Sequence, residues 1–293
     1  MSKIPDSLAT GPAKVFATRK PPVAVAIAPN GGRRTKADHP ALPTTTAELV
    51  RVAAESLEAG AAMIHLHIRD PQGRHLLDAE TYRRTIAAIK QTVGDRLVIQ
   101  ITSESIGRYE PAAQMAMVKA LRPEAVSLGL RELVPDATSE RYFADFLAWL
   151  KRERVTPQII LYSTDEARRL GRLNASGLIP WPNVPVLFVL GSYAGTRTSE
   201  PADLLPYLAP DMPHFAHWMI CAFGRNEAAC VTAAAQRGGH VRVGFENNLF
   251  QPDGTLAPDN AAQVRTTCRM LRAAGCRLAD ATSLRAAWAT LQT

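Results

Sequence analysis

The feature that most constrains the fold of this chain is a regular alternation of short apolar, β-branched runs with segments of helical periodicity. Apolar runs on this scale are typical of strands buried on both faces, as in parallel sheets. Eight successive strand–helix units favour a closed (β/α)8 TIM barrel over an open doubly wound sheet. The expected strands span residues 23–28, 61–68, 96–102, 124–130, 157–163, 184–191, 214–223 and 240–246.

Helical patterns fill the connections between these strands. The first begins in a run of threonines, which are favoured N-caps, and closes on Gly60, a favoured C-terminal residue. The segment "APNGGRR" after the first strand lacks the spacing of a dinucleotide-binding fingerprint, which argues against a Rossmann domain. The expected helices span residues 44–60, 78–94, 111–121, 139–155, 164–177, 226–239 and 259–275, with a loop and helix before the seventh strand.

The length of 293 residues suits one barrel domain, expected over residues 22–293. Residues 1–21 are expected to form a loose leader, because they contain no apolar stretch typical of a signal peptide. No apolar run is long enough to span a membrane, so a cytoplasmic protein is expected. The four cysteines include no C-x-x-C pair and are expected to be reduced core residues.

The formal net charge is +7 and the sequence pI is about 9.5. The basic residues are spread along the chain, and no nucleic-acid motif with interleaved aromatic residues is found. A basic balance of this kind describes either a solvated surface or one that attracts an anionic small molecule, such as a phosphate-bearing cofactor. Neither a nucleic-acid partner nor a membrane partner is expected.

Two histidines stand one residue apart in the second expected strand, in "MIHLHIRDPQGR". Side chains alternate along a strand, so His65 and His67 share one face. The eighth expected strand ends at Glu246, and the first, second and eighth strands are neighbours in a closed barrel. Two histidines and one carboxylate with an open position form the ligand set of a catalytic Zn²⁺ site. The alternative is a hydrogen-bonded pair of core histidines and a surface glutamate.

Several motifs in this chain resemble the beta-keto acid cleavage enzyme family. They are "AGAAMIHLHIRDPQGR", "ADHPALPTTTAEL", "VLFVLG" and "GGHVRVGFENNLF", in order from about residue 22 to the C-terminus. The resemblance implies a tetrameric, Zn²⁺-dependent (β/α)8 barrel. It also implies an activity that converts a β-keto acid and acetyl-CoA into acetoacetate and a new CoA thioester.

The resemblance assigns roles to individual residues. His65, His67 and Glu246 match the metal ligands, and Arg242 matches an arginine at the reacting centre. Thr102 and Ser127 match positions that carry hydroxyl groups, which would bridge protons or hold a thioester oxygen.

Three residues depart from the family pattern. Asn247 stands where a carboxylate is usual, and an amide cannot act as a carboxylate base. Arg33 stands where an acidic residue often follows the first strand, and a guanidinium suits an anion rather than an amine. Glu104 falls in a segment that is usually "S-T-G-G", as either a replacement carboxylate or a surface charge. A neutral or anionic keto acid is therefore expected in preference to an amino-bearing one.

Two other functions fit the same residues. One is a metal-dependent aldolase or lyase, because a strand His-x-His pair also occurs in other barrel metalloenzymes. The other is a non-catalytic relative that binds a metal and a small carboxylate, an interpretation that Asn247 and Arg33 keep open. Dependence on a thioester distinguishes the first alternative, and turnover with acetyl-CoA excludes the second.

Overall fold

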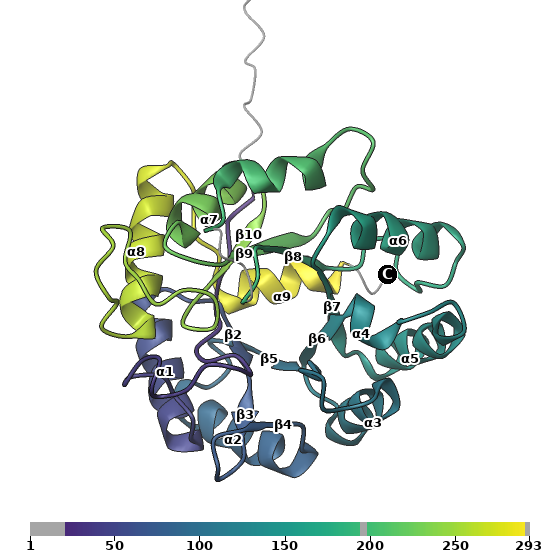
Figure 1. Ribbon diagram of the computed structural model, residues 1–293, viewed down its shortest axis with the longest axis horizontal. Coiled ribbons are helices and arrows are strands. Elements are labelled where there is room, and N and C mark those ends of the chain that lie inside the picture. Colours follow the sequence, from purple (N-terminus) through teal and green to yellow (C-terminus); the bar gives the residue numbers. More distant parts are fainter. Residues whose placement is uncertain (1–20, 194–197, 291–293) are drawn as a thin grey trace, which may run out of the picture.

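The computed structural model describes residues 21–193 and 198–290. Its core is a closed barrel of parallel strands in the spatial order β1-β10-β9-β8-β7-β6-β5-β2, as the sequence predicts for a (β/α)8 fold (Figure 1). The barrel strands are β1 (Val25–Ile27), β2 (Met63–Leu66), β5 (Val98–Thr102), β6 (Ala125–Gly129), β7 (Thr156–Leu161), β8 (Val186–Leu190), β9 (Trp218–Ala222) and β10 (His240–Val243).

Helices surround the barrel and bury their apolar faces against it (Figure 1). They are α1 (Thr46–Ala59), α2 (Ala79–Val93), α3 (Pro111–Leu121), α4 (Leu130–Leu133), α5 (Ser139–Glu153), α6 (Thr164–Ala175), the 3₁₀ helix η1 (Pro201–Leu208), α7 (Glu227–Ala235), α8 (Asn260–Ala273) and α9 (Ala281–Ala289). α1 begins where the sequence predicts: Thr45 and Glu48 form a reciprocal capping box, and Gly60 ends the helix at φ 109°.

Four short elements, two helices and the two strands of a hairpin, were not predicted from the sequence. The short helix α4 follows β6 directly, and a two-stranded hairpin of β3 (Ile68–Arg69) and β4 (His75–Leu76) follows β2. α9 crosses the middle of the ring in Figure 1. Arg285 on α9 donates to the carbonyls of Asp95 and Leu97, just before β5, so α9 covers the N-terminal end of the barrel.

All eight predicted strands are longer than the observed ones, and the early ends of the second and the eighth matter for the site. The second ends at Leu66, and the chain then enters the β3–β4 hairpin. The eighth ends at Val243, because Gly244 turns at φ 135° with its Cα against the backbone of β1. A Cβ at Gly244 would lie 2.3 Å from the Ala28 oxygen, so this approach requires glycine. Glu246 therefore lies on a turn after β10 and not on the strand itself.

Other expectations concern the cysteines, the leader and the membrane. All four cysteines are free thiols, three of them buried. The expected leader, residues 1–21, falls almost entirely outside the described residues. Within the described part of the chain, no helix combines the length and apolar character that a membrane crossing requires.

Candidate active site

A cavity of about 370 Å³ opens at the C-terminal ends of the barrel strands, within the size range of small-molecule sites. This is the end of a (β/α)8 barrel at which active sites are found. Polar side chains from most of the strands, or from the loops that follow them, reach it. Those among the predicted site residues that line it are Arg33, His65, Thr102, Glu104, Arg242, Glu246 and Asn247.

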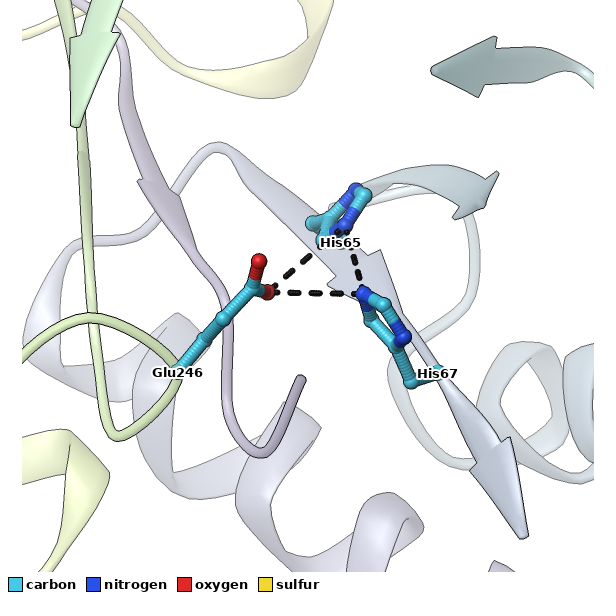
Figure 2. A group of neighbouring side chains, drawn as sticks. All are labelled: His65, His67 and Glu246. Atoms are coloured by element: carbon cyan, nitrogen blue, oxygen red, sulfur yellow. Dashed lines mark hydrogen bonds and ion pairs between the residues drawn. The ribbon is translucent and has the colours of Figure 1, made fainter. Parts of the chain in front are cut away.

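His65, His67 and Glu246 point toward one another at this end of the barrel (Figure 2). The two Nε2 atoms of the histidines lie 3.1 Å apart. Oε2 of Glu246 lies 3.7 Å from Nε2 of His65 and 3.5 Å from Nε2 of His67. All three side chains are buried, and their ligand atoms lie within 4.8 Å of one another. The structure thus brings together the three ligands that the sequence predicts, across β2, β1 and β10.

The chemistry of this group fits a divalent metal ion. Burial lowers the pKa of His65 to about 4, which leaves the imidazole neutral and able to coordinate. Its Nδ1 atom lies 2.7 Å from Oε1 of Gln100, an acceptor that keeps the proton on Nδ1 and the lone pair on Nε2. Oε2 of Glu246 is buried and receives no hydrogen bond from the described residues. A carboxylate oxygen left in this state beside two imidazole nitrogens has the donor type and the position that a metal ligand would need.

The turn that presents Glu246 is held from several sides. The Glu227 carboxylate, at the start of α7, accepts hydrogen bonds from the Gly244 amide (3.3 Å) and from Nδ2 of Asn248 (3.2 Å). Asn260 on α8 accepts from the Phe245 amide (3.0 Å), and Gln263 donates to the Asn248 carbonyl (2.8 Å). Because these hydrogen bonds hold both ends of the turn, they fix the position of the Glu246 backbone and so the point from which its side chain reaches the histidines.

Arg242 lies beside the proposed ligand carboxylate. Its Nη2 atom donates to Oε1 of Glu246 at 3.1 Å and to Oδ1 of Asn247 at 3.4 Å. Its Nε and Nη1 atoms are buried without a hydrogen-bond partner in the described part of the chain. Nδ2 of Asn247 is also buried and has no hydrogen-bond partner among the described residues. Arg242 and Asn247 both line the cavity, and buried donors without a partner call for an acceptor that the described residues do not supply.

Thr102 ends β5, Ser127 lies on the neighbouring β6, and Glu104 lies two residues after β5. The Ser127 hydroxyl donates to the Thr102 hydroxyl at 3.3 Å, but Ser127 is fully buried and does not line the cavity. Oε2 of Glu104 lies 3.8 Å from Nε2 of His67. Burial, aided by the negative charge of Glu246, raises the pKa of Glu104 to about 8. Glu104 is thus a site carboxylate, and only 17% of its side chain is exposed.

The loop after β1 carries Arg33 to the rim of the cavity. Its guanidinium lies over the Tyr193 ring, 5.7 Å from the ring centroid. The loop is held by the buried Arg69, which donates to the carbonyls of Asn30, Gly31 and Arg34. This contact explains the arginine that follows the two histidines in the sequence. Arg69 fixes the neighbouring loop and does not face the cavity.

Sequence reasoning missed several residues around the site. Gln100 and Gln158 are buried amides inside the barrel, and each interrupts an otherwise apolar strand, which was a usable signal. Glu132 and Arg131 line the cavity from α4, a helix that the sequence pattern did not predict. The ring of His75 lies 5.2 Å from that of His67, and its Nε2 atom is 2.7 Å from the Glu104 carbonyl. The β3–β4 hairpin brings it there.

A closed (β/α)8 barrel with buried histidines, a carboxylate and an arginine around an open C-terminal cavity defines the class of (β/α)8-barrel enzymes. The particular family follows from the sequence. The family model for beta-keto acid cleavage enzymes matches residues 22–289, and the chain belongs to that family.

Two curated relatives and one solved structure illustrate the similarity. The 3-keto-5-aminohexanoate cleavage enzyme of Fusobacterium nucleatum is 29% identical over 254 residues, covering 85% of this chain and 91% of the relative. The 3-oxoadipate:acetyl-CoA acetyltransferase of Cupriavidus necator is 25% identical over 278 residues, covering 90% and 94%. The structure of ObcA with oxaloacetate has a TM-score of 0.64 at 17% identity, covers 85% of this chain and 67% of that one, and supports the barrel fold.

Proposed function

We propose that this enzyme converts a β-keto acid and acetyl-CoA into acetoacetate and a new acyl-CoA. In this exchange the bond between the keto carbon and the carboxymethyl carbon breaks, and so does the thioester bond of acetyl-CoA. The acetyl group joins the carboxymethyl carbon, and the CoA sulfur joins the keto carbon, so atoms and electrons balance. Family membership and the relatives named for acetyl-CoA-dependent reactions support this reaction.

The observation that carries the proposal is the position of Glu246. Its unpartnered Oε2 atom lies beside the Nε2 atoms of His65 and His67 at the mouth of the barrel. We propose that these three side chains hold Zn²⁺ or another divalent metal. When bound, such an ion supplies positive charge that polarises the keto oxygen of a substrate.

Arg242 has the donors to orient the substrate and stabilise developing negative charge. With Nη2 on Glu246 and Asn247, its unpartnered Nε and Nη1 hydrogens are left for a carboxylate or an oxyanion. The Thr102 hydroxyl lines the same cavity and accepts from the Glu104 amide at 2.9 Å. Ser127 would act only indirectly, because its hydroxyl donates to the Thr102 hydroxyl and does not itself line the cavity.

If the carboxymethyl carbon is protonated or deprotonated during this exchange, a carboxylate other than the proposed ligand would have to do it, since Asn247 is an amide. Two further carboxylates among the described residues line the cavity. Glu132 accepts a hydrogen bond from the Ser105 amide at 2.8 Å, whereas the Glu104 carboxylate accepts none from the described residues. Glu104 is therefore placed to carry the proton in this chain, in addition to shaping the substrate site.

The acid that this site prefers is proposed to carry a neutral or anionic tail. Arg33 at the rim adds a cation to the cavity, and Asn247 contributes no negative charge. The net charge of +7 also supports attraction of the CoA phosphates. By resemblance to the family, we further propose a cytoplasmic homotetramer, which light scattering of the purified protein would test.

The deciding experiment is a screen of β-keto acids, including dicarboxylic ones, with and without acetyl-CoA. Acetoacetate and acyl-CoA should form together, in equal amounts, and only when acetyl-CoA is present. Cleavage without a thioester would indicate an aldolase or lyase instead. A complete lack of turnover across the screen would favour a non-catalytic carboxylate-binding relative.

A further inference from the structure

A chain of amides runs through the barrel interior beneath the proposed metal site. Gln100 on β5 and Gln158 on β7 are both buried. Oε1 of Gln100 lies 2.7 Å from Nδ1 of His65, and Nε2 of Gln100 donates to Oε1 of Gln158 at 3.1 Å. Nε2 of Gln158 then faces Sδ of Met219 at 3.8 Å. This series of hydrogen bonds therefore starts at His65, a proposed ligand, and ends at the thioether of Met219.

The thioether of Met219 determines which group donates and which accepts in every hydrogen bond of this series. A thioether sulfur accepts but cannot donate, so the NH₂ group of Gln158 faces Met219 and its oxygen faces Gln100. Gln100 must then turn its own NH₂ group to Gln158 and its oxygen to His65. Because an amide oxygen only accepts, the proton of the neutral His65 ring lies on Nδ1. Its Nε2 atom carries a lone pair toward the metal site.

His67 is left in the opposite state before a metal binds. Its Nε2 atom lies 3.1 Å from Nε2 of His65, which carries a lone pair, so His67 donates from Nε2. Nδ1 of His67 is buried and has no hydrogen-bond partner among the described residues. To coordinate a metal through Nε2, His67 has to move its proton to Nδ1, where the described residues offer no acceptor.

We propose that Gln100, oriented by Gln158 and Met219, is a positioning residue that presets His65 as the anchoring metal ligand, while His67 must change tautomer to join it. The proposal rests on the metal site of the proposed function. The tautomers of His65 and His67 can be measured without any metal, so a failure of the positioning role of Gln100 can be told apart from a failure of the proposed metal site.

The first test is ¹⁵N NMR of the full-length, chelator-treated protein with labelled histidine. We expect His65 protonated on Nδ1 and His67 protonated on Nε2. In Gln100→Leu, the His65 signal should lose its preference for Nδ1. A wild-type His65 protonated on Nε2, or a Gln100→Leu spectrum with an unchanged His65 tautomer, would overturn the proposal.

The second test is Zn²⁺ affinity, measured by competition with a chromophoric chelator. Loss of a hydrogen-bond partner of a metal-bound histidine typically lowers affinity about 10- to 100-fold, and we expect this for Gln100→Leu. Gln100→Glu keeps an acceptor for Nδ1 of His65 and should stay within about threefold of wild type, although Gln158 must give up its bond to Sδ of Met219 to donate to the new carboxylate. Gln114→Leu, at a buried glutamine on α3 outside this chain of amides, is the matched control and should bind Zn²⁺ as wild type does.

If Gln100→Leu does not fold, Gln158→Leu serves in its place, since it leaves Gln100 present but free to rotate. A smaller loss of Zn²⁺ affinity and a mixed His65 tautomer are expected. Wild-type affinity in both leucine variants would refute the positioning role. A wild-type protein that binds no Zn²⁺ would refute the proposed metal site, and the NMR result would still decide the role of the amides.

Discussion

Nη2 of Arg242 donates to Oε1 of Glu246 at 3.1 Å, and this bond leaves the other oxygen of the carboxylate facing His65 and His67. The two residues are four positions apart, one on β10 and one on the turn that follows it. A single arginine thus orients the proposed ligand carboxylate and keeps two buried nitrogens, Nε and Nη1, that have no hydrogen-bond partner among the described residues. A point charge such as a lysine ammonium could not hold Glu246 and also bind a substrate oxygen in this geometry, because the two contacts use different N–H groups of one planar guanidinium.

Arg242→Lys should therefore lower kcat/KM strongly while the protein stays folded. The lysine ammonium keeps the charge but cannot bond Glu246 and a substrate oxygen in the same geometry. Loss of one preorganised donor of this kind lowers turnover about 10²- to 10³-fold. Steady-state kinetics and thermal unfolding of the same preparation would check this.

Arg285→Lys is the matched control for that substitution. Arg285 also pairs with a glutamate, Glu124, but at the N-terminal end of the barrel. We expect this variant to alter the unfolding midpoint and leave kcat/KM unchanged. Equal kinetic effects of the two substitutions would show that Arg242 acts through stability alone.

Metal content gives the most direct test of the three predicted ligands. His67→Ala removes one of three proposed ligands, so the purified protein should lose most of its bound metal and its activity. Elemental analysis after mild purification measures the occupancy. His217→Ala, at a partly exposed histidine preceding β9, is the control and should retain the metal. Full occupancy in His67→Ala would contradict the assignment of these ligands.

The sequence predicts the barrel and the three converging side chains well, because both follow from local periodicity and strand adjacency. Apolar runs at 184–191 and 157–163 mark β8 and β7 to within a few residues. The placement of His65 next to Glu246 then follows from closure of the barrel, which sets β2 and β10 on either side of β1.

The parts that the sequence does not predict depend on tertiary contacts. The early end of β10 comes from the approach of Gly244 to the Ala28 carbonyl, which no local pattern encodes. The bonds of Glu227 to the following turn join α7 to residues 17 and 21 positions away. The β3–β4 hairpin brings His75 beside His67 through pairing that is too short to give a periodic signal.

The buried Glu227 should make stability depend on pH. Burial raises the pKa of this carboxyl to about 8, above its value of about 4.3 in an unfolded chain. The folded state holds the proton more tightly, so this contribution to stability is fully present below about pH 4 and is lost as pH rises toward 8. The buried histidines act in the opposite direction below about pH 6.5, because their lowered pKa values make stability rise with pH there. Thermal unfolding between pH 7 and 8 should therefore show a declining midpoint, to which the raised pKa of Glu104 also contributes, and Glu227→Gln should make the decline shallower.

Glu58→Gln, at an exposed glutamate, is the control for that measurement and should leave the pH profile of the wild type unchanged. A Glu227→Gln profile as steep as that of the wild type would show that other groups produce the slope. Because Glu227 bonds the turn that carries Glu246, the metal content of the same variant should be recorded beside its stability.

Arg33 provides the test of substrate charge. It lies at the cavity rim over Tyr193, where a guanidinium attracts the tail of an anionic keto acid and repels an amino group. Wild-type enzyme should have a higher kcat/KM for a carboxylate-terminated β-keto acid than for 3-keto-5-aminohexanoate. Arg33→Gln should lower kcat/KM for the carboxylate-terminated acid up to about tenfold, equivalent to about 1.4 kcal/mol, and leave an uncharged acid of similar length unaffected.

Lys36→Gln is the control: it removes the same charge from the same loop, but Lys36 pairs with Glu48 and does not line the cavity, so the selectivity of this variant should match that of the wild type. If the amino-bearing acid is preferred tenfold by the wild type, or if both variants behave alike, Arg33 is a solvated loop residue and the acidic groups of the cavity, Glu104 among them, determine which tail is accepted.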